Sequence, residues 1–304
     1  MTGTVLVCTL LVFVGLEISI PRGFRAVVMP LGLPEDSPAG QAIIDRFHLD
    51  SNVFVRWGHW VWDCLNGDFG ITGFRGQPVA EVITHRLPIS LEIMLVGLAL
   101  MILVGIPLGV FAASRSNAGK GTIINGFLGI SQSVPVFITA TFLIWLFALQ
   151  LEWLPAAGWT RISNSLFANL ETLVLPAVAL AFAEIGIVAR VIRGDVLREL
   201  QSDYVAAAIG KGLSHRYILF RHVLRPASLG LMNVIGVNAG ALLSGALVVE
   251  IVFGIGGLGR EVLDATINRD LYLLLALTVY TVVVYVVING LVDALMQAID
   301  PRIR

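Results

Sequence analysis

Long apolar segments alternate with polar ones along the chain, and this alternation predicts helices that cross a membrane. The apolar segments lie at about residues 5–20, 89–113, 123–149, 173–189, 228–252 and 271–292. A helix needs about 20 residues to cross the hydrocarbon core, so segment 5–20, which contains Glu17, is short. It has neither the basic start nor the cleavage site of a signal peptide, which favours an uncleaved first span over a processed one.

Composition agrees with this pattern. The chain has 304 residues, of which 57% are hydrophobic and 13% charged, whereas soluble domains carry about 25% charged residues. The two cysteines, Cys8 and Cys64, offer no disulfide framework. We therefore predict an all-α membrane protein: one domain over residues 1–304 with about six transmembrane helices.

The first polar segment, residues 21–88, is too charged for lipid and is predicted to be a long external loop. Residues 34–40 are typical of a loop, and residues 43–65 have helical character, with Val53, Trp57, Trp60 and Val61 near one face. A tryptophan-rich amphipathic segment is typical of a membrane interface. The favoured interpretation is an interfacial anchor; the alternative is that Trp57 and Trp60 dock an external partner.

Basic residues predict the orientation. Of the 20 lysines and arginines, seven lie between Arg190 and Arg225, two in the turn at Arg115 and Lys120, and two in the C-terminal tail. With six spans, all three places lie on one face, which the positive-inside rule makes cytoplasmic. Both termini and the segment 190–226 are then cytoplasmic, in a cell membrane that the chain crosses several times.

The central segment, residues 203–226, predicts two short helices that meet at glycines. Asp203 is expected to cap the first helix and Ser214 the second. Gly210 and Gly212 interrupt the pattern, and Pro226 is expected to end the second helix. Small side chains at 206–208 beside such a turn suit close packing against another surface.

Five acidic residues lie in or near the spans, where ionisable groups are functional candidates by default. They are Glu17, Glu92, Glu184, Glu250 and Asp293. Most lie near a span end, so a structural role is favoured, with Glu184 and Glu250 the candidates for a translocation pathway or gate. The five histidines are scattered, and no Ser-His-Asp or metal-ligand spacing occurs. We predict neither an enzyme nor a metal protein.

Gly254, Gly256 and Gly259 match the G-x-G-x-x-G dinucleotide pattern. That pattern requires a preceding strand and a following helix, whereas here it follows a predicted span, so we expect a tight backbone turn. No phosphate-binding G-x-x-x-x-G-K-[ST] loop is present, which predicts that the chain binds no ATP itself.

The central segment DYVAAAIGKGLSHRYILFRHVLRPA resembles the cytoplasmic loop of importer-type ABC transporter permeases, in the version of the dipeptide, oligopeptide and nickel group. Ala206, Ala207, Ala208 and Gly212 match the first half of the family signature, with Ala206 in place of its glutamate. Leu224 fits the second half, and Pro226 stands one place late. The segments LNGDFGIT, PVAEVITHRLPISLEI, SVPVF and VVEIVFGIGGLG, the last including Glu250, also resemble the family.

This resemblance implies a non-catalytic permease subunit that forms half of a pathway for dipeptides or oligopeptides. The implied partners are a second permease subunit, two cytoplasmic ATPases and an extracytoplasmic substrate-binding protein, without nucleic acid. The ATPases use ATP and Mg, and the chain itself binds no cofactor. The loop implied to couple the ATPases to the spans contains Asp203, Tyr204, Ala206, Ala207, Ala208, Gly210, Gly212, Leu213 and Leu224. The alternative, an ion-coupled secondary transporter, requires paired inverted repeats, which the sequence does not show.

Overall fold

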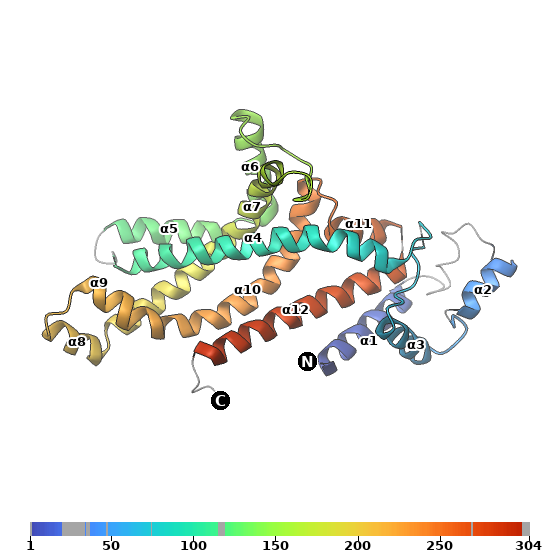
Figure 1. Ribbon diagram of the computed structural model, residues 1–304, viewed down its shortest axis with the longest axis horizontal. Helices are drawn as coiled ribbons and strands as arrows, with labels where there is room; N and C mark the ends of the chain where they lie inside the picture. The colour runs from blue at the N-terminus through green and yellow to red at the C-terminus, as the bar shows by residue number, and fades with distance from the viewer. Residues whose placement is uncertain are drawn as a thin grey trace. The chain divides into compact units, whose positions relative to one another are not determined.

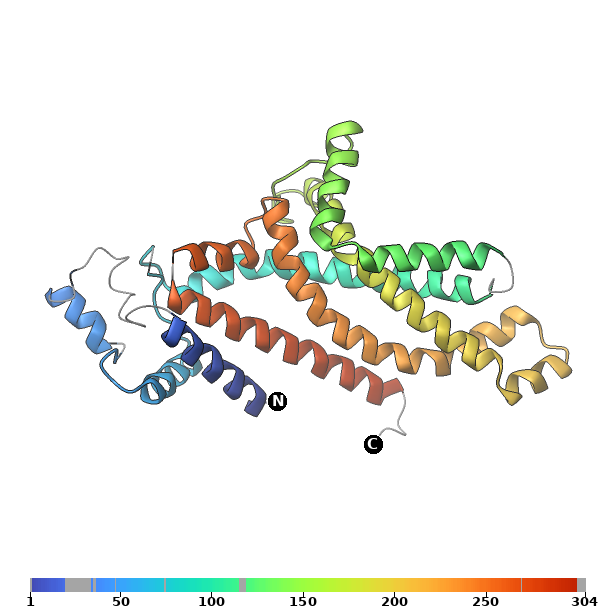
Figure 2. The ribbon, with the colours of Figure 1, turned by 180° about the vertical axis from the view of Figure 1, so that it is seen from behind.

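The computed structural model describes residues 2–19, 34, 37–46, 48–73, 75–114, 119–268 and 270–299, and most of these residues are helical (Figures 1 and 2). The chain divides into two compact units. One unit comprises Met1–Ser90 with Gly256–Val286, and the other comprises Leu91–Ile255 with Val287–Arg304. Helices α4 (Val79–Ser114) and α12 (Leu271–Ile299) contribute residues to both.

The first unit contains the N-terminal helices and the segment after the glycine-rich motif. Its helices besides α4 and α12 are α1 (Thr2–Ser19), α2 (Pro38–Arg46), α3 (Val53–Leu65) and α11 (Leu258–Ile267). Their apolar faces form one core that includes Phe13, Trp60, Val82 and Leu271. Burial of such side chains is worth roughly 1.5–3 kcal/mol each, so this core holds α1 and α3 to α12.

The predicted helical segment 43–65 is two helices. A turn over residues 48–51 separates α2 from α3, and His48 there has a φ of +52°. Asn52 begins α3, since its side-chain oxygen accepts a hydrogen bond from the Phe54 amide at 3.0 Å. The expected loop at 34–40 ends earlier than predicted, because Pro38 begins α2. Proline suits a first helical turn, where its missing N–H is not needed. The predicted exit from the first span, after residue 19, lies outside the described residues.

The second unit is a helical bundle around α7 (Leu166–Leu200). Helices α5 (Gly119–Ser133), α6 (Val136–Leu143) and α10 (Leu224–Val252) pack against α7. Glycines let α4 approach the same helix: a methyl group on Gly105 would lie 2.9 Å from Cγ1 of Val188, and one on Gly109 would collide with the main-chain oxygen of Ala189. Small residues at such contacts are typical of helix packing in membranes, where close backbone approach supplies the attraction.

Among the described residues, four helices are long and apolar enough to cross a membrane: α4, α7, residues 234–252 of α10, and residues 271–292 of α12. A fifth candidate is a bent pair, and α1 is a shorter apolar helix. Each predicted segment is therefore helical, but the predicted third span, 123–149, is not one kinked helix. It bends by 101° between Ser133 and Val136, because Pro135 has no N–H for the helical ladder and instead occupies the N-cap position of α6.

The helix ends and short connections of this bundle differ from the prediction in detail. After α6, a π-helical segment η2 (Ile144–Gln150) completes the bent pair. Helix α7 extends beyond the predicted 173–189 in both directions, so residues 190–200 of the predicted central loop are helical. Part of the predicted basic turn, including Arg115, lies outside the described residues. The tail 300–304 lies wholly outside them.

Candidate functional site

The candidate coupling loop consists of two short helices between the end of α7 and the start of α10. Helix α8 (Asp203–Gly210) follows α7 after two residues, and α9 (His215–Tyr217) leads through the π-helical segment η3 (Ile218–Val223) into α10. Figure 1 shows α8 and α9 together beyond the ends of α7 and α10. The loop is thus joined directly to two membrane-spanning candidates.

The elbow between α8 and α9 is at Gly212, as predicted. This residue has a φ of +75°, a region that side-chain-bearing residues avoid. The Gly212 amide donates to Ile209 O at 2.9 Å and the Leu213 amide donates to Ala208 O at 3.3 Å, which terminates α8 in the manner of a glycine helix cap. No atom lies within 4 Å of a Cβ built on Gly212, so the requirement for glycine is conformational and not steric.

Of the two predicted helix caps, the cap of α9 is confirmed and the cap of α8 is not. Ser214 caps α9, since its hydroxyl accepts from the Tyr217 amide at 3.3 Å. The predicted cap at Asp203 is wrong, because Ser202 occupies the cap position and Asp203 lies in the first turn of α8. There the Asp203 carboxylate is favourable beside the positive end of the helix dipole.

Pro226 does not end the second helix, contrary to the prediction. Helical structure continues from α9 through η3 into α10, which contains Leu224 and Pro226 in its first turn. A proline there cannot donate to the carbonyl four residues earlier, that of His222. The Tyr204 hydroxyl donates its one proton to Oε2 of Glu199 at 2.6 Å and lies 3.4 Å from His222 O. Tyr204 therefore ties α8 to the last turn of α7 and lies beside the end of η3.

The loop presents an apolar outer surface. Val205 and Ala208 point inward, one helical turn apart, whereas Ala206 and Ala207 are exposed. The large apolar side chains Ile209, Leu213, Tyr217 and Phe220 are also exposed. Several exposed large apolar side chains on two adjacent short helices are typical of an interaction surface. Ala208, which was predicted to lie on a small-residue face that packs against another surface, is buried inside the loop itself.

The two predicted pathway residues lie elsewhere in the second unit. Glu184 is on α7 between Leu180 and Val188, which pack against glycines of α4, and its Oε2 is buried with no hydrogen-bond partner among the described residues. Glu250, near the end of α10, is fully buried, and its main-chain oxygen accepts from the Ile255 amide at 2.8 Å. Neither residue belongs to the loop between α7 and α10. Of the other acidic candidates, Glu17 has an ion-pair partner in Arg56 of α3. Oε1 of Glu92 is buried with no hydrogen-bond partner among the described residues, and the side chain of Asp293 is outside the described residues.

The predicted docking residues are placed in the first unit and are largely internal. Trp60 belongs to the core, and Trp57 Nε1 donates to Thr9 Oγ1 of α1 at 3.3 Å. Trp60 is buried and Trp57 is half-buried, and docking of an external partner by these two rings stays a prediction. The exposed apolar side chains of α3 are Phe54, Val55, Trp62 and Leu65, which the sequence prediction did not single out.

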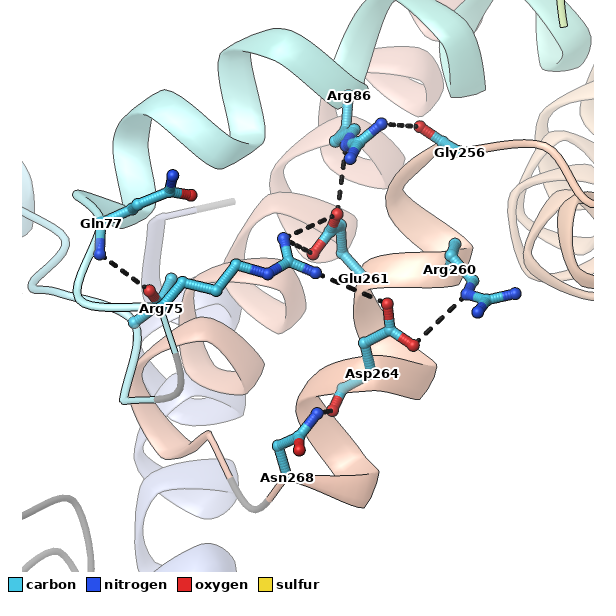
Figure 3. A network of polar contacts seen from close by, with 9 residues as sticks. Arg75, Gln77, Arg86, Gly256, Arg260, Glu261, Asp264 and Asn268 are labelled. Carbon is cyan, nitrogen blue, oxygen red and sulfur yellow. Dashed lines mark hydrogen bonds and ion pairs between the residues drawn. The ribbon is translucent and has the colours of Figure 1, made fainter. Parts of the chain in front are cut away.

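An ion-pair cluster in the first unit explains the glycine-rich motif (Figure 3). The buried carboxylate of Glu261 accepts from Arg75 Nη1 at 3.1 Å and from Arg86 Nε at 3.1 Å. Arg86 Nη1 also donates to Gly256 O at 3.0 Å, and a methyl group on Gly256 would lie 2.8 Å from that same nitrogen. Ser90 Oγ accepts from the Leu258 amide at 2.9 Å. Gly256 therefore leaves room for Arg86, and the motif joins the start of α11 to α4.

Comparison with known proteins assigns the chain to a family. The family described as binding-protein-dependent transport system inner membrane component matches residues 105–304. A probable peptide ABC transporter permease protein, y4tP, of Sinorhizobium fredii is 37% identical over 262 residues, which cover 86% of this chain and 84% of the relative. The oligopeptide transport system permease AppB of Bacillus subtilis is 33% identical, with 90% and 89% covered, and OppB of Salmonella typhimurium is 31% identical, with 85% and 83% covered.

Solved structures share the fold. The inward-facing MetNI methionine ABC transporter aligns with a TM-score of 0.61 at 18% identity, covering 72% of this chain and 96% of that one. An amino acid ABC transporter aligns with a TM-score of 0.53 at 15% identity, covering 72% and 94%. The matching family and the curated relatives, which are named as ABC transporter and oligopeptide transport system permeases, favour the importer over an ion-coupled secondary transporter. The chain belongs to the family of binding-protein-dependent transport system inner membrane components.

Proposed function

We propose that this chain is one of two membrane-spanning subunits of a peptide importer, and that the loop from α8 to η3 receives the movement of cytoplasmic ATPase subunits. The observation that carries the proposal is the exposed apolar surface of that loop, set at the junction of α7 and α10. A surface that binds an ATPase here is connected by helices to the spans on both sides.

The loop is suited to transmit force because its shape is defined. Gly212 sets the angle between α8 and α9, and Tyr204 ties α8 to Glu199 and packs beside His222 O. A displacement of α8 would therefore move the ends of α7 and α10 together, and rigid-body movement of helices is a common route between outward and inward openings.

Peptides are the proposed substrate class because the curated relatives are named as peptide and oligopeptide permeases. Selection would begin at an extracytoplasmic binding protein, which delivers the peptide to the outer side of the pathway. Glu184 is a candidate contact within the spans, since its buried Oε2 has no partner among the described residues. The ammonium group that all peptides carry would satisfy it.

The experiment is site-specific cross-linking in the assembled importer, after replacement of Cys8 and Cys64 by serine. A cysteine at exposed Ala207 is expected to cross-link to an ATPase subunit, and a cysteine at exposed Asn66, in the predicted external segment, is the matched control. Cross-links from Asn66 and none from Ala207 would contradict the proposal. Uptake by vesicles of labelled dipeptides and oligopeptides, set against labelled amino acids and nickel chelates, tests the substrate class.

A further inference from the structure

The exposed side of helix α3 is apolar, whereas a helix that faces water usually exposes polar side chains. Its outward side carries Phe54, Trp62 and Leu65, which are 60%, 67% and 77% exposed, and Gly58 lies between Phe54 and Trp62. Spacings of four, four and three residues place these positions in one stripe along the helix. Every member of the stripe is apolar, and the neighbouring exposed residue Val55 extends it.

The charged residue of α3 that water would attract is instead turned inward. Arg56 is 6% exposed, its Nη2 lies 2.7 Å from Oε1 of Glu17, and its guanidinium carbon lies 6.0 Å from the centre of the Phe13 ring. Burying an arginine is costly unless it is paired, and a long arginine side chain reaches water when water is near. Because Arg56 is held inward and paired with Glu17, it adds no charge to the outward, apolar side of α3.

The contacts of α3 place it along the length of α1. They involve Thr9, Phe13 and Glu17, which recur every four residues on one face of α1. Eight residues of helix extend over about 12 Å, so α3 lies beside a substantial part of α1. Apart from Glu17, α1 contains no charged residue, and its own exposed side chains include Leu6, Val7 and Leu11.

We propose that the stripe of Phe54, Trp62 and Leu65 faces the acyl chains of the lipid bilayer, so that α3 lies within the membrane beside α1 and not in the external aqueous phase. With 13 residues, α3 is about 20 Å long, shorter than the hydrocarbon thickness of about 30 Å. It enters the bilayer without crossing it. This inference is independent of the proposed coupling loop.

Polar residues of α3 mark its aqueous edge. His59 is exposed, and with Arg56, Asp63, Asp68 and His48 it lines a small cavity of the first unit. The His48 and His59 rings lie 4.3 Å apart, centre to centre. These groups are adjacent to one another and separate from the apolar stripe around the helix. One side of α3 therefore faces lipid, while His59 remains in contact with water.

The test measures the surroundings of α3 directly. Nitroxide labels are placed on single cysteines at Phe54, Trp62, Leu65 and His59 in the full chain, with Cys8 and Cys64 replaced by serine. The chain is reconstituted in phosphatidylcholine vesicles, and collisions with oxygen, which concentrates in lipid, are compared with collisions with a water-soluble nickel complex. At the three stripe positions we expect oxygen collisions to exceed nickel collisions several-fold, and at His59 the reverse.

Two results would overturn the proposal. Nickel collisions at the stripe positions equal to those at His59 would place the stripe in water. Loss of the oxygen collisions at the stripe positions on addition of the substrate-binding protein would make the stripe a protein-docking surface instead. Because a label at Trp62 perturbs a large side chain, retention of peptide uptake by each variant confirms that the labelled chain is folded.

Discussion

The phenol oxygen of Tyr204 donates a hydrogen bond of 2.6 Å to the carboxylate of Glu199. This bond joins the first turn of α8 to the last turn of α7. Desolvation, and after it the hydrogen bond to Glu199, raises the pKa of the Tyr204 hydroxyl, so the group stays protonated and able to donate at neutral pH.

Removing this hydroxyl should loosen the loop without removing its apolar surface. Tyr204→Phe is expected to leave ATPase association intact while lowering peptide uptake per ATP hydrolysed several-fold, because a partly exposed charge-assisted hydrogen bond is worth about 1 kcal/mol. Tyr217→Phe, which removes the other tyrosine hydroxyl of the loop, is the control. Equal uptake per ATP hydrolysed in the two variants would show that the Tyr204 tie does not transmit movement. Glu199→Ala, which removes the acceptor, should resemble Tyr204→Phe, and the double variant should be no worse than either.

The Glu261 cluster predicts a stability effect confined to the first unit. Glu261→Gln leaves Arg75 and Arg86 without their shared buried carboxylate. Because both arginines remain about one-third exposed and can be hydrated, the expected cost is about 1–3 kcal/mol. The measurement is the midpoint of thermal unfolding in detergent, with Glu81→Gln, an exposed carboxylate of α4, as the control. An unchanged midpoint for Glu261→Gln would contradict a structural role of the cluster.

The third prediction concerns the close packing of α4 on α7. Gly109→Ala adds a methyl group that collides with the backbone at Ala189, so the helices must separate and lose contacts along their length. We expect a lower unfolding midpoint and less assembled importer. Gly126→Ala in α5 is the matched control, since nothing lies within 4 Å of its added methyl group. If Gly109→Ala were as stable as Gly126→Ala, the close approach of α4 and α7 would be wrong.

The orientation of the chain remains a prediction that labelling can test. A single cysteine at Ser214 should react with a membrane-impermeant reagent only from the cytoplasmic side, and one at Ser37 only from outside, because the positive-inside rule places residues 190–225 in the cytoplasm. Reaction of both from the same side would contradict the predicted arrangement of spans.

The sequence predicted the places of the helices and the Gly212 elbow because these depend on local properties. Apolar runs report burial in lipid, and a glycine between two helical patterns indicates a conformation that other residues avoid. The errors arose where neighbouring structure decides the outcome. Pro226 was expected to end a helix, but a π-helical segment precedes it and Tyr204 lies beside the carbonyl that it leaves without a donor.

Pairings between distant residues could not be predicted from one sequence. Arg86 and Glu261 are 175 positions apart, and nothing in either local pattern indicates the other. Trp57 and Trp60 illustrate the same limit, since helical periodicity places them on one face but does not say whether that face meets protein or lipid. The inward position of Arg56 was the missing observation, because it fixes which side of α3 is internal.

The central claim, that the loop from α8 to η3 transmits ATPase movement through a defined elbow, is tested most directly at Gly212. The measurement is peptide uptake per ATP hydrolysed in vesicles that contain the assembled importer, for Gly212→Val and Gly210→Val. Both positions have open space around an added side chain, but only Gly212 has a positive φ, which costs a side-chain-bearing residue roughly 1–2 kcal/mol. The account predicts a loss of about tenfold in uptake per ATP, or of ATPase association, for Gly212→Val, and a smaller loss for Gly210→Val. Equal, near-normal coupling in both variants would contradict it.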